Sequence, residues 1–320
     1  MGKLVEGVWR DEGYQTDKTG GRFVRKDSSF RDKITANGES GFKAEAGRYH
    51  LYLSWACPWA HRTLIFRRLK KLEDVISVSF VEPLMLENGW TFGPDGDPIN
   101  GADYLYQIYL KAKPDYSGRV TVPVLWDKKT QTIVNNESAE IIRMLNSEFN
   151  AFGDASLDFY PAHLRGEIDA INEEVYAKVN NGVYRTGFAT TQEAYEEAFD
   201  SLFEALDNLE GRLSSSRYLV GDQITEADWR LFTTLVRFDS VYVGHFKCNL
   251  RRIVDYPNLW GYLRELYQVP GVAQTVNMDQ IKSHYYTSHK TVNPTGIVPK
   301  GPELNFASAH GRENVKGKAA

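Results

Sequence analysis

The stretch Arg48–Arg62, RYHLYLSWACPWAHR, holds the junction that decides the fold. Residues 48–53 alternate as a strand does, and a Cys-Pro pair follows shortly after them. Pro58 fits the first turn of a helix, where no backbone N–H is needed. Beyond it, apolar side chains recur at helical spacing, at Leu64, Ile65, Leu69 and Leu72. The sequence therefore predicts a strand that runs into a helix, with Cys57 at the helix N-cap.

The surroundings of Cys57 predict a reactive thiol. The N-cap faces unpaired backbone N–H groups and the positive end of the helix dipole, which favour the thiolate and lower the pKa of a cysteine. His61 and Arg62 add positive charge in the same turn. The alternative, a buried and inert cysteine, would need neither the proline nor the cap.

The fourth position of the Cys-Pro-X-X motif is Ala60 rather than a second cysteine. A mixed disulfide on Cys57 therefore has no internal thiol at that position to resolve it. The resolving thiol has to come from outside, and glutathione is the abundant thiol of the cytosol. This favours monothiol chemistry with glutathione as co-substrate and no permanently bound cofactor.

Composition excludes several classes of function. The 320 residues are 42% hydrophobic and 25% charged, as in globular domains, and the net charge of −4 gives no basic footprint for nucleic acid. No stretch approaches the roughly 18 apolar residues of a membrane span. Two cysteines are too few for a disulfide framework and favour a reducing compartment, the cytoplasm. The seven histidines form no metal-ligand pattern.

The first half of the chain predicts an α/β domain over residues 49–150. Strand character returns at Val75–Val81, Val120–Trp126 and Thr132–Val134, and Glu137–Phe149 has helical spacing. Glycines and prolines predict a long loop over residues 82–118. Residues 1–48 are polar and glycine-rich, which indicates an extended arm with little secondary structure.

The second half predicts an all-helical domain over residues 155–280. Apolar spacing of three and four marks helices at Ala162–Val179, Gln192–Leu213, Thr225–Phe238 and Leu259–Val269. Thr225 and Asp228 have the spacing of a capping box. Residues 281–320 lose periodicity and are expected to form a C-terminal extension that frays over Lys316–Ala320.

Val122-Pro123 lies about 65 residues after Cys57, where thioredoxin-like domains carry a cis-proline. A cis bond would expose the Val122 N–H and C=O to the cysteinyl backbone of glutathione; the alternative is an ordinary trans proline of an edge strand.

Ser138 N–H and the Glu137 carboxylate, at a helix start, are candidates for the ends of a γ-glutamyl group. Taken alone, that pair is an everyday helix cap.

With these features in place, the chain resembles the glutathione transferases and, more narrowly, their xi class, the glutathionyl-hydroquinone reductases. The resemblance covers nearly the whole chain. It rests on TGG at 19–21, CPWAHR at 57–62, PLMLENGWTF at 83–92, SGRVTVPVLW at 117–126, NESAEI at 136–141, NNGVY at 180–184, LVRFD at 235–239 and HKTVNPTG at 289–296.

The resemblance implies a thioredoxin-like domain followed by an all-helical one. It implies reduction of S-glutathionyl-hydroquinones by glutathione, and a homodimer assembled differently from other glutathione transferases. The family's functional residues carry over to one nucleophile, six glutathione-site positions and two aryl-site tyrosines: Cys57; Trp90, Arg119, Val122, Pro123, Glu137 and Ser138; and Tyr184 and Tyr285.

The chemistry explains why tyrosines are needed. Attack of the Cys57 thiolate on the glutathionyl sulfur would expel an aryl carbanion, which is a very poor leaving group. Protonation of the sulfur-bearing carbon gives a keto tautomer that leaves as a stabilised phenolate, so the site needs a proton donor and hydrogen-bond donors for the oxyanion. Tyr184 and Tyr285 are the candidates, and packing in the core is their alternative role.

Two other functions stay open at this stage. One is an omega-like thiol transferase or dehydroascorbate reductase, and the other is a non-catalytic binder of aromatic ligands. Arg237, in an otherwise apolar helix, is interpreted as structural, and Cys248 as a bystander.

Overall fold

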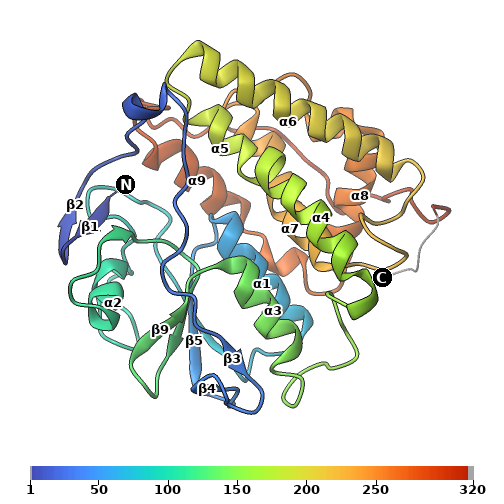
Figure 1. The fold of residues 1–320 in the computed structure, drawn as a ribbon. Coiled ribbons are helices and arrows are strands. Elements are labelled where there is room, and N and C mark those ends of the chain that lie inside the picture. The colour runs from blue at the N-terminus through green and yellow to red at the C-terminus, as the bar shows by residue number, and fades with distance from the viewer. Residues whose placement is uncertain (1, 316–320) are drawn as a thin grey trace. The chain divides into compact units, whose positions relative to one another are not determined.

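The computed structural model describes residues 2–315 and divides into two compact units (Figure 1). The first comprises the chain as far as Tyr14, together with Lys26–Asp158 and Asp279–His284; the second comprises Gln15–Arg25, Phe159–Met278 and the chain from Tyr285 onward. The fraying expected at Lys316–Ala320 lies outside the described residues. No helix within residues 2–315 combines the length and apolar character that a membrane span requires.

The strands are short. They are β1 (Lys3–Val5), β2 (Val8–Arg10), β3 (Ile34–Thr35), β4 (Phe42–Lys43), β5 (Tyr49–Leu53), β6 (Ser77–Phe80), β7 (Gly118–Arg119), β8 (Val124–Asp127) and β9 (Thr132–Asn135). The α-helices are α1 (Pro58–Leu69), α2 (Leu105–Ala112), α3 (Ser138–Ser147), α4 (Arg165–Glu174), α5 (Gly182–Gly187), α6 (Gln192–Leu213), α7 (Glu226–Arg237), α8 (Pro257–Gln268) and α9 (Met278–Ser288). The 3₁₀ turns are η1 (Asp17–Thr19), η2 (Ala162–Leu164), η5 (Ile253–Asp255) and η6 (Ala273–Thr275), and the π-helical segments are η3 (Val175–Asn180) and η4 (Phe238–Tyr242).

A four-stranded sheet of order β6-β5-β8-β9 forms the centre of the first unit. Strand β5 pairs parallel with β6 and antiparallel with β8, and all five of its residues are buried. Two of its polar side chains form hydrogen bonds: Tyr52 Oη donates to Asp97 Oδ2 at 3.0 Å, and His50 Nδ1 lies 2.8 Å from Ser77 Oγ. Burial lowers the pKa of His50 to about 3, so this ring is neutral inside the sheet.

Helices α1 and α3 pack against each other, as Figure 1 shows. Both begin directly after a residue with extended backbone, Cys57 for α1 and Glu137 for α3. Pro58 occupies the first turn of α1, as the sequence predicts.

The second unit is helical, and α6, α7 and α8 agree with three of the expected helices. Helix α6 has the predicted bounds, and α7 begins with the predicted capping box, in which Asp228 Oδ2 accepts from Thr225 N at 2.7 Å. Asp228 Oδ1 also accepts from Leu219 N and Tyr262 Oη. The fold class, a thioredoxin-like α/β domain plus an all-α domain, is confirmed.

The arm has little regular secondary structure, as expected, but it does contain a hairpin: Glu6 and Gly7 both adopt positive φ and turn β1 back on β2, while β1 also pairs with β7. Two other expectations are wrong. The loop over residues 82–118 contains α2, where the Gln107 side chain caps the helix start by accepting from Tyr104 N at 3.0 Å. The extension predicted from residue 281 begins as a helix, α9.

The predicted helix Ala162–Val179 is also interrupted. It is a 3₁₀ turn, then α4, then the π-helical segment η3 that leads to α5. A second π-helical segment, η4, continues α7. Segments of this kind add a residue to a turn and often occur at functional sites.

Replacing Asp228 tests the capping box. Asp228→Ala leaves the buried Thr225 N, Leu219 N and Tyr262 Oη without this acceptor, at a cost of about 4 kcal/mol. The melting temperature of the helical unit is expected to fall by about 10 °C in calorimetry. Asp200→Ala, which removes an exposed carboxylate from α6, should change it by no more than about 2 °C; equal melting temperatures for the two variants would contradict the assignment.

Candidate active site

Cys57 is the N-cap residue of α1, as predicted, with φ −76° and ψ 120°. Its carbonyl accepts the first helical hydrogen bond, from His61 N at 3.0 Å. The side chain is partly exposed and forms no disulfide. The sulfur therefore lies at the N-terminal end of α1, in reach of a ligand.

The Val122-Pro123 peptide bond is cis, as expected. The Cys57 Sγ lies 3.4 Å from the Val122 carbonyl oxygen. Residues 65 positions apart are thus in contact in the first unit. The role of Val122 and Pro123 in holding glutathione stays a prediction.

The start of α3 lies close to that of α1. Arg62, one turn after Cys57, directs Nη1 to Ser138 Oγ at 3.5 Å. The Glu137 carboxylate accepts from Ala139 N and from Ser28 Oγ, both at 3.1 Å. Glu137 is therefore a helix cap here, and a role toward a γ-glutamyl group stays a prediction.

Trp90 is buried in the first unit, where it stacks on His284. Its ring stacks on that of His284, with centroids 4.8 Å apart and an interplanar angle of 17°. His284 Nδ1 donates to the Pro83 carbonyl at 2.8 Å, which places its proton on that nitrogen. Trp90 is thus anchored between the glycine-rich loop and α9.

Arg119 holds the N-terminal segment. Its guanidinium donates to the carbonyl oxygens of Gly2, Glu12 and Gly13 and lies over the ring of Tyr14. A pocket of about 300 Å³ adjoins it. Thr121 and Asn136, the sequence neighbours of Val122 and Glu137, line this pocket together with Lys3, Lys26 and Ser28.

Tyr184 and Tyr285, the two predicted aryl-site tyrosines, meet in the second unit. Their hydroxyl oxygens are 2.5 Å apart, and Tyr242 Oη lies 3.2 Å from that of Tyr285. All three side chains are buried. Burial raises the pKa of Tyr285 well above its ordinary value, its two tyrosine neighbours add to this, and the positive charge of Arg237 opposes it.

An aromatic shell surrounds the three tyrosines. The rings of Phe188 and Phe246 lie 6.1 and 5.6 Å from that of Tyr184. His245 Nε2 and His289 Nδ1 are 3.0 Å apart, and both rings pack near Tyr285. An acid buried in such a shell gives up its proton only to a group that reaches it.

Two residues beside the tyrosine pair, Tyr242 and Arg25, are not predicted from the sequence. Tyr242 ends the π-helical segment η4 and stands four residues after Phe238 and four before Phe246, a spacing that marks it as part of the same face. Arg25, in the arm, lies over the Tyr184 ring at 5.0 Å from its centroid. No local pattern distinguishes it.

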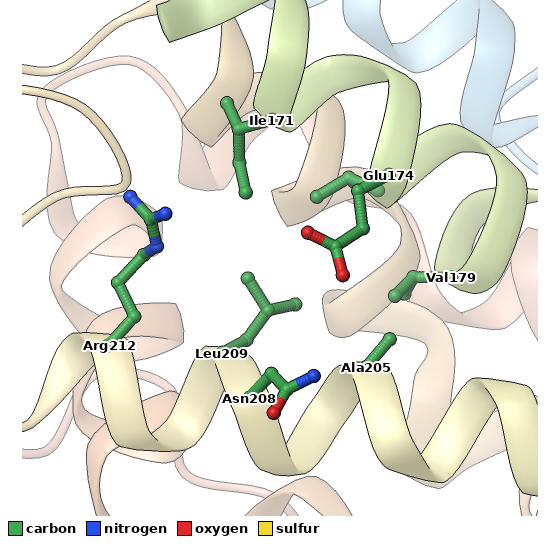
Figure 2. Close-up of a pocket in the computed structure, with 8 residues that line it drawn as sticks. Ile171, Glu174, Val179, Ala205, Asn208, Leu209 and Arg212 are labelled. Carbon is green, nitrogen blue, oxygen red and sulfur yellow. The ribbon is translucent and has the colours of Figure 1, made fainter.

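Figure 2 shows a second pocket, of about 230 Å³, in the helical unit. Its lining side chains come from α4, η3 and α6, and Glu174 and Arg212 lie on either side of an apolar floor. None of the predicted site residues lines it. This pocket is therefore separate from the tyrosines described above.

Arg237 and Cys248 are both fully buried. Arg237 donates from Nη1 to the Thr233 carbonyl at 2.7 Å. Burial raises the pKa of the Cys248 thiol well above that of an ordinary cysteine. These observations agree with a structural Arg237 and a bystander Cys248, and Arg237 also acts electrostatically on Tyr285.

Two family models match the chain: "Glutathione S-transferase, N-terminal domain" over residues 56–148 and "Glutathione S-transferase, C-terminal domain" over residues 192–265. The chain is 60% identical to the glutathionyl-hydroquinone reductase PcpF of Sphingobium chlorophenolicum, over 94% of this chain and 96% of that protein. It is 59% identical to the glutathionyl-hydroquinone reductase YqjG of Escherichia coli K12, over 98% and 99%.

Two solved structures are similar to this chain in fold and sequence. The glutathione-bound structure of the E. coli protein matches with a TM-score of 0.90 at 56% identity, over 97% of this chain and 99% of that one. The xi-class glutathione transferase of Natrialba magadii matches with a TM-score of 0.92 at 49% identity, over 99% and 98%.

The two cysteines are expected to differ in reactivity. Iodoacetamide should add once to the native protein, at partly exposed Cys57, because Cys248 is fully buried and its raised pKa disfavours the thiolate. Intact mass and peptide mapping measure this. Cys57→Ser should take up no label when native and one label in urea; label on Cys248 in the native protein would contradict the assignment.

Proposed function

The chain belongs to the glutathionyl-hydroquinone reductases, the xi class of the glutathione transferase family, and we propose that it works through a mixed disulfide between Cys57 and glutathione. The substrate is an S-glutathionyl-hydroquinone, and the products are the hydroquinone and glutathione disulfide. The observation that carries the proposal is the partly exposed Cys57 at the N-cap of α1, next to the Val122 backbone.

In the first step, the Cys57 thiolate attacks the glutathionyl sulfur of the keto tautomer. The new S–S bond joins Cys57 to glutathione, and the electron pair of the broken C–S bond passes into the ring to give the phenolate. In the second step, a glutathione thiolate attacks this mixed disulfide, releasing glutathione disulfide and the Cys57 thiolate. The ring carbon is reduced, and the thioether sulfur of the substrate and the thiol sulfur of the second glutathione are oxidised to one disulfide.

The glutathionyl group needs partners along its whole length. We assign its cysteinyl backbone to Val122 and Pro123, and its γ-glutamyl end to Glu137 and Ser138 at the start of α3. The contact between Arg62 and Ser138 supports this, because it keeps both helix starts close to each other. Both starts present N–H groups, which suit a thiolate and a carboxylate. Trp90 and Arg119 are assigned to the same ligand by the resemblance alone.

The proton for the ring carbon is assigned to the Tyr184–Tyr285 pair. A 2.5 Å separation of two hydroxyl oxygens requires that one donates to the other. Tyr242, also within reach of Tyr285, holds that hydroxyl from a second side. The same hydroxyls can donate to the oxyanion that develops on the substrate.

The proposal also covers the oligomeric state and the cellular compartment. A homodimer follows from the family resemblance. The cytoplasm follows from the chemistry, since a monothiol mechanism requires reduced glutathione. An omega-like thiol transferase is less favoured, because relatives near 60% identity are glutathionyl-hydroquinone reductases. A non-catalytic binder would not need the N-cap thiol.

Cys57→Ala tests the nucleophile. The wild-type protein, given a glutathionyl-hydroquinone without reductant, is expected to gain the mass of one glutathione on Cys57 and to release hydroquinone. Cys57→Ala should gain no mass, and its turnover should fall by at least about a thousandfold, as for loss of a covalent nucleophile. Cys248→Ser is the matched control and should keep both properties. Undiminished turnover in Cys57→Ala would refute the mechanism.

Tyr184→Phe separates the acid from the nucleophile. The variant keeps the ring packing but loses the hydroxyl bonded to Tyr285, so hydroquinone release should slow by about a hundredfold, the lower range for a general acid. The rate of Cys57 alkylation should not change. An equal fall in both rates would show that Tyr184 shapes the thiolate instead of supplying a proton.

A further inference from the structure

We propose that Arg25, in the N-terminal arm, is a positioning residue for the proton donor Tyr184: its guanidinium fixes the tyrosine ring and strengthens the tyrosine as an acid. This inference rests on the proposed function and names a residue that neither the sequence motifs nor the catalytic chemistry had assigned.

Arg25 reaches Tyr184 by two contacts. Its guanidinium carbon lies 5.0 Å from the centroid of the Tyr184 ring, and its Nε donates to Asn181 Oδ1 at 3.0 Å. Asn181 is also the residue whose carbonyl accepts from Tyr184 N at 3.1 Å, at the start of α5. The turn that carries Tyr184 therefore also holds the arginine over its ring.

The charge has a chemical consequence. A cation near an aromatic ring is attracted to its negative face, and it stabilises a phenolate more than a neutral phenol. Tyr184 is buried with 8% exposure and Arg25 is partly exposed, so water screens this attraction only in part. When the hydroxyl gives up its proton to the substrate carbon, negative charge develops beneath Arg25. The arginine thus acts most strongly in the transition state.

The N-terminal arm is held against the helical unit close to Arg25. Residues 15–25 belong to the helical unit, although the chain on both sides belongs to the α/β unit. Thr190 N donates to the Gly21 carbonyl, and Thr191 Oγ1 donates to that of Gly20. Gly21 has φ +82°, and a side chain there would collide with Thr191. The Thr-Gly-Gly motif therefore has a structural purpose that the chemistry alone does not explain.

Arg22 provides a matched control on the same arm. It forms ion pairs with Glu193 and Glu197 of α6, at 3.0 and 2.9 Å, on the exposed side. Losing them removes one positive charge and one attachment of the arm, while the backbone bonds of Gly20 and Gly21 remain. The other groups around the tyrosines, Arg237, Tyr242, His245 and His289, are the same in both variants.

The test is a double-mutant cycle on hydroquinone release. Arg25→Gln is expected to lower kcat by about tenfold, within the range of one partly desolvated cation–ring contact, with KM for glutathione and the rate of Cys57 alkylation unchanged. In a Tyr184→Phe background, the same substitution should lower kcat by less than about twofold, since contacting residues that act together are not additive. Arg25→Lys, which keeps the charge, should recover part of the loss.

A second readout separates acidity from packing. The solvent deuterium isotope effect on kcat should rise in Arg25→Gln, because proton transfer becomes slower, and should stay at the wild-type value in Arg22→Gln. Arg22→Gln should also keep kcat within about twofold of wild type.

Three outcomes would overturn the inference: wild-type turnover in Arg25→Gln, an equal loss on the Tyr184→Phe background, or an equal loss and isotope effect in Arg22→Gln. Each of these leaves the proposed function standing, because it presupposes that the wild-type protein releases hydroquinone. Failure of the wild-type protein to do so would instead refute the proposed function itself.

Discussion

The junction between β5 and α1 constrains the thiol chemistry of the first unit. Strand β5 is buried along its whole length and is paired on both edges, so the point where the chain leaves the sheet is fixed. Pro58 starts the helix at once, and this leaves Cys57 as the N-cap. The sulfur therefore takes its position from the backbone, which moves less than a side chain in a flexible loop. The Val122 carbonyl, one strand away, lies beside it for the same reason.

Much of the fold follows from local patterns, and the failures have physical causes. The bounds of α6 were predictable because a long helix repeats its apolar face several times. Helix α2 was missed because it spans only about two turns between glycines and prolines, and its N-cap is Tyr104, a residue outside the usual N-cap set. The hairpin of β1 and β2 was missed because three-residue strands are too short to show alternation. The π-helical segments break the period on which helix prediction depends.

The residues of the candidate site also differ in how far the sequence predicts them. Cys57 was predictable because its chemistry resides in four consecutive residues and a helix start. The tyrosines were suggested by resemblance, but their mutual contact was not, since Tyr184 and Tyr285 are 101 residues apart. Tyr242 could have been suspected only from its spacing of four residues from Phe238 and from Phe246. Arg25 had none, because its meaning depends on an arm that joins the helical unit through bonds of Gly20 and Gly21.

The proposed reaction needs an anionic sulfur and a neutral phenol at the same pH, and the two units create opposite environments for them. A helix N-terminus favours negative charge on a thiol. Burial among aromatic rings disfavours it on a phenol, and the pKa of Tyr285 is accordingly raised. Burial alone would also make the phenol a poor acid, because a proton held too tightly transfers slowly. The positive charges of Arg237 near Tyr285 and of Arg25 over Tyr184 offset part of that effect. In the proposed mechanism, the acid thus stays protonated at rest while the cost of its ionisation during the reaction is reduced.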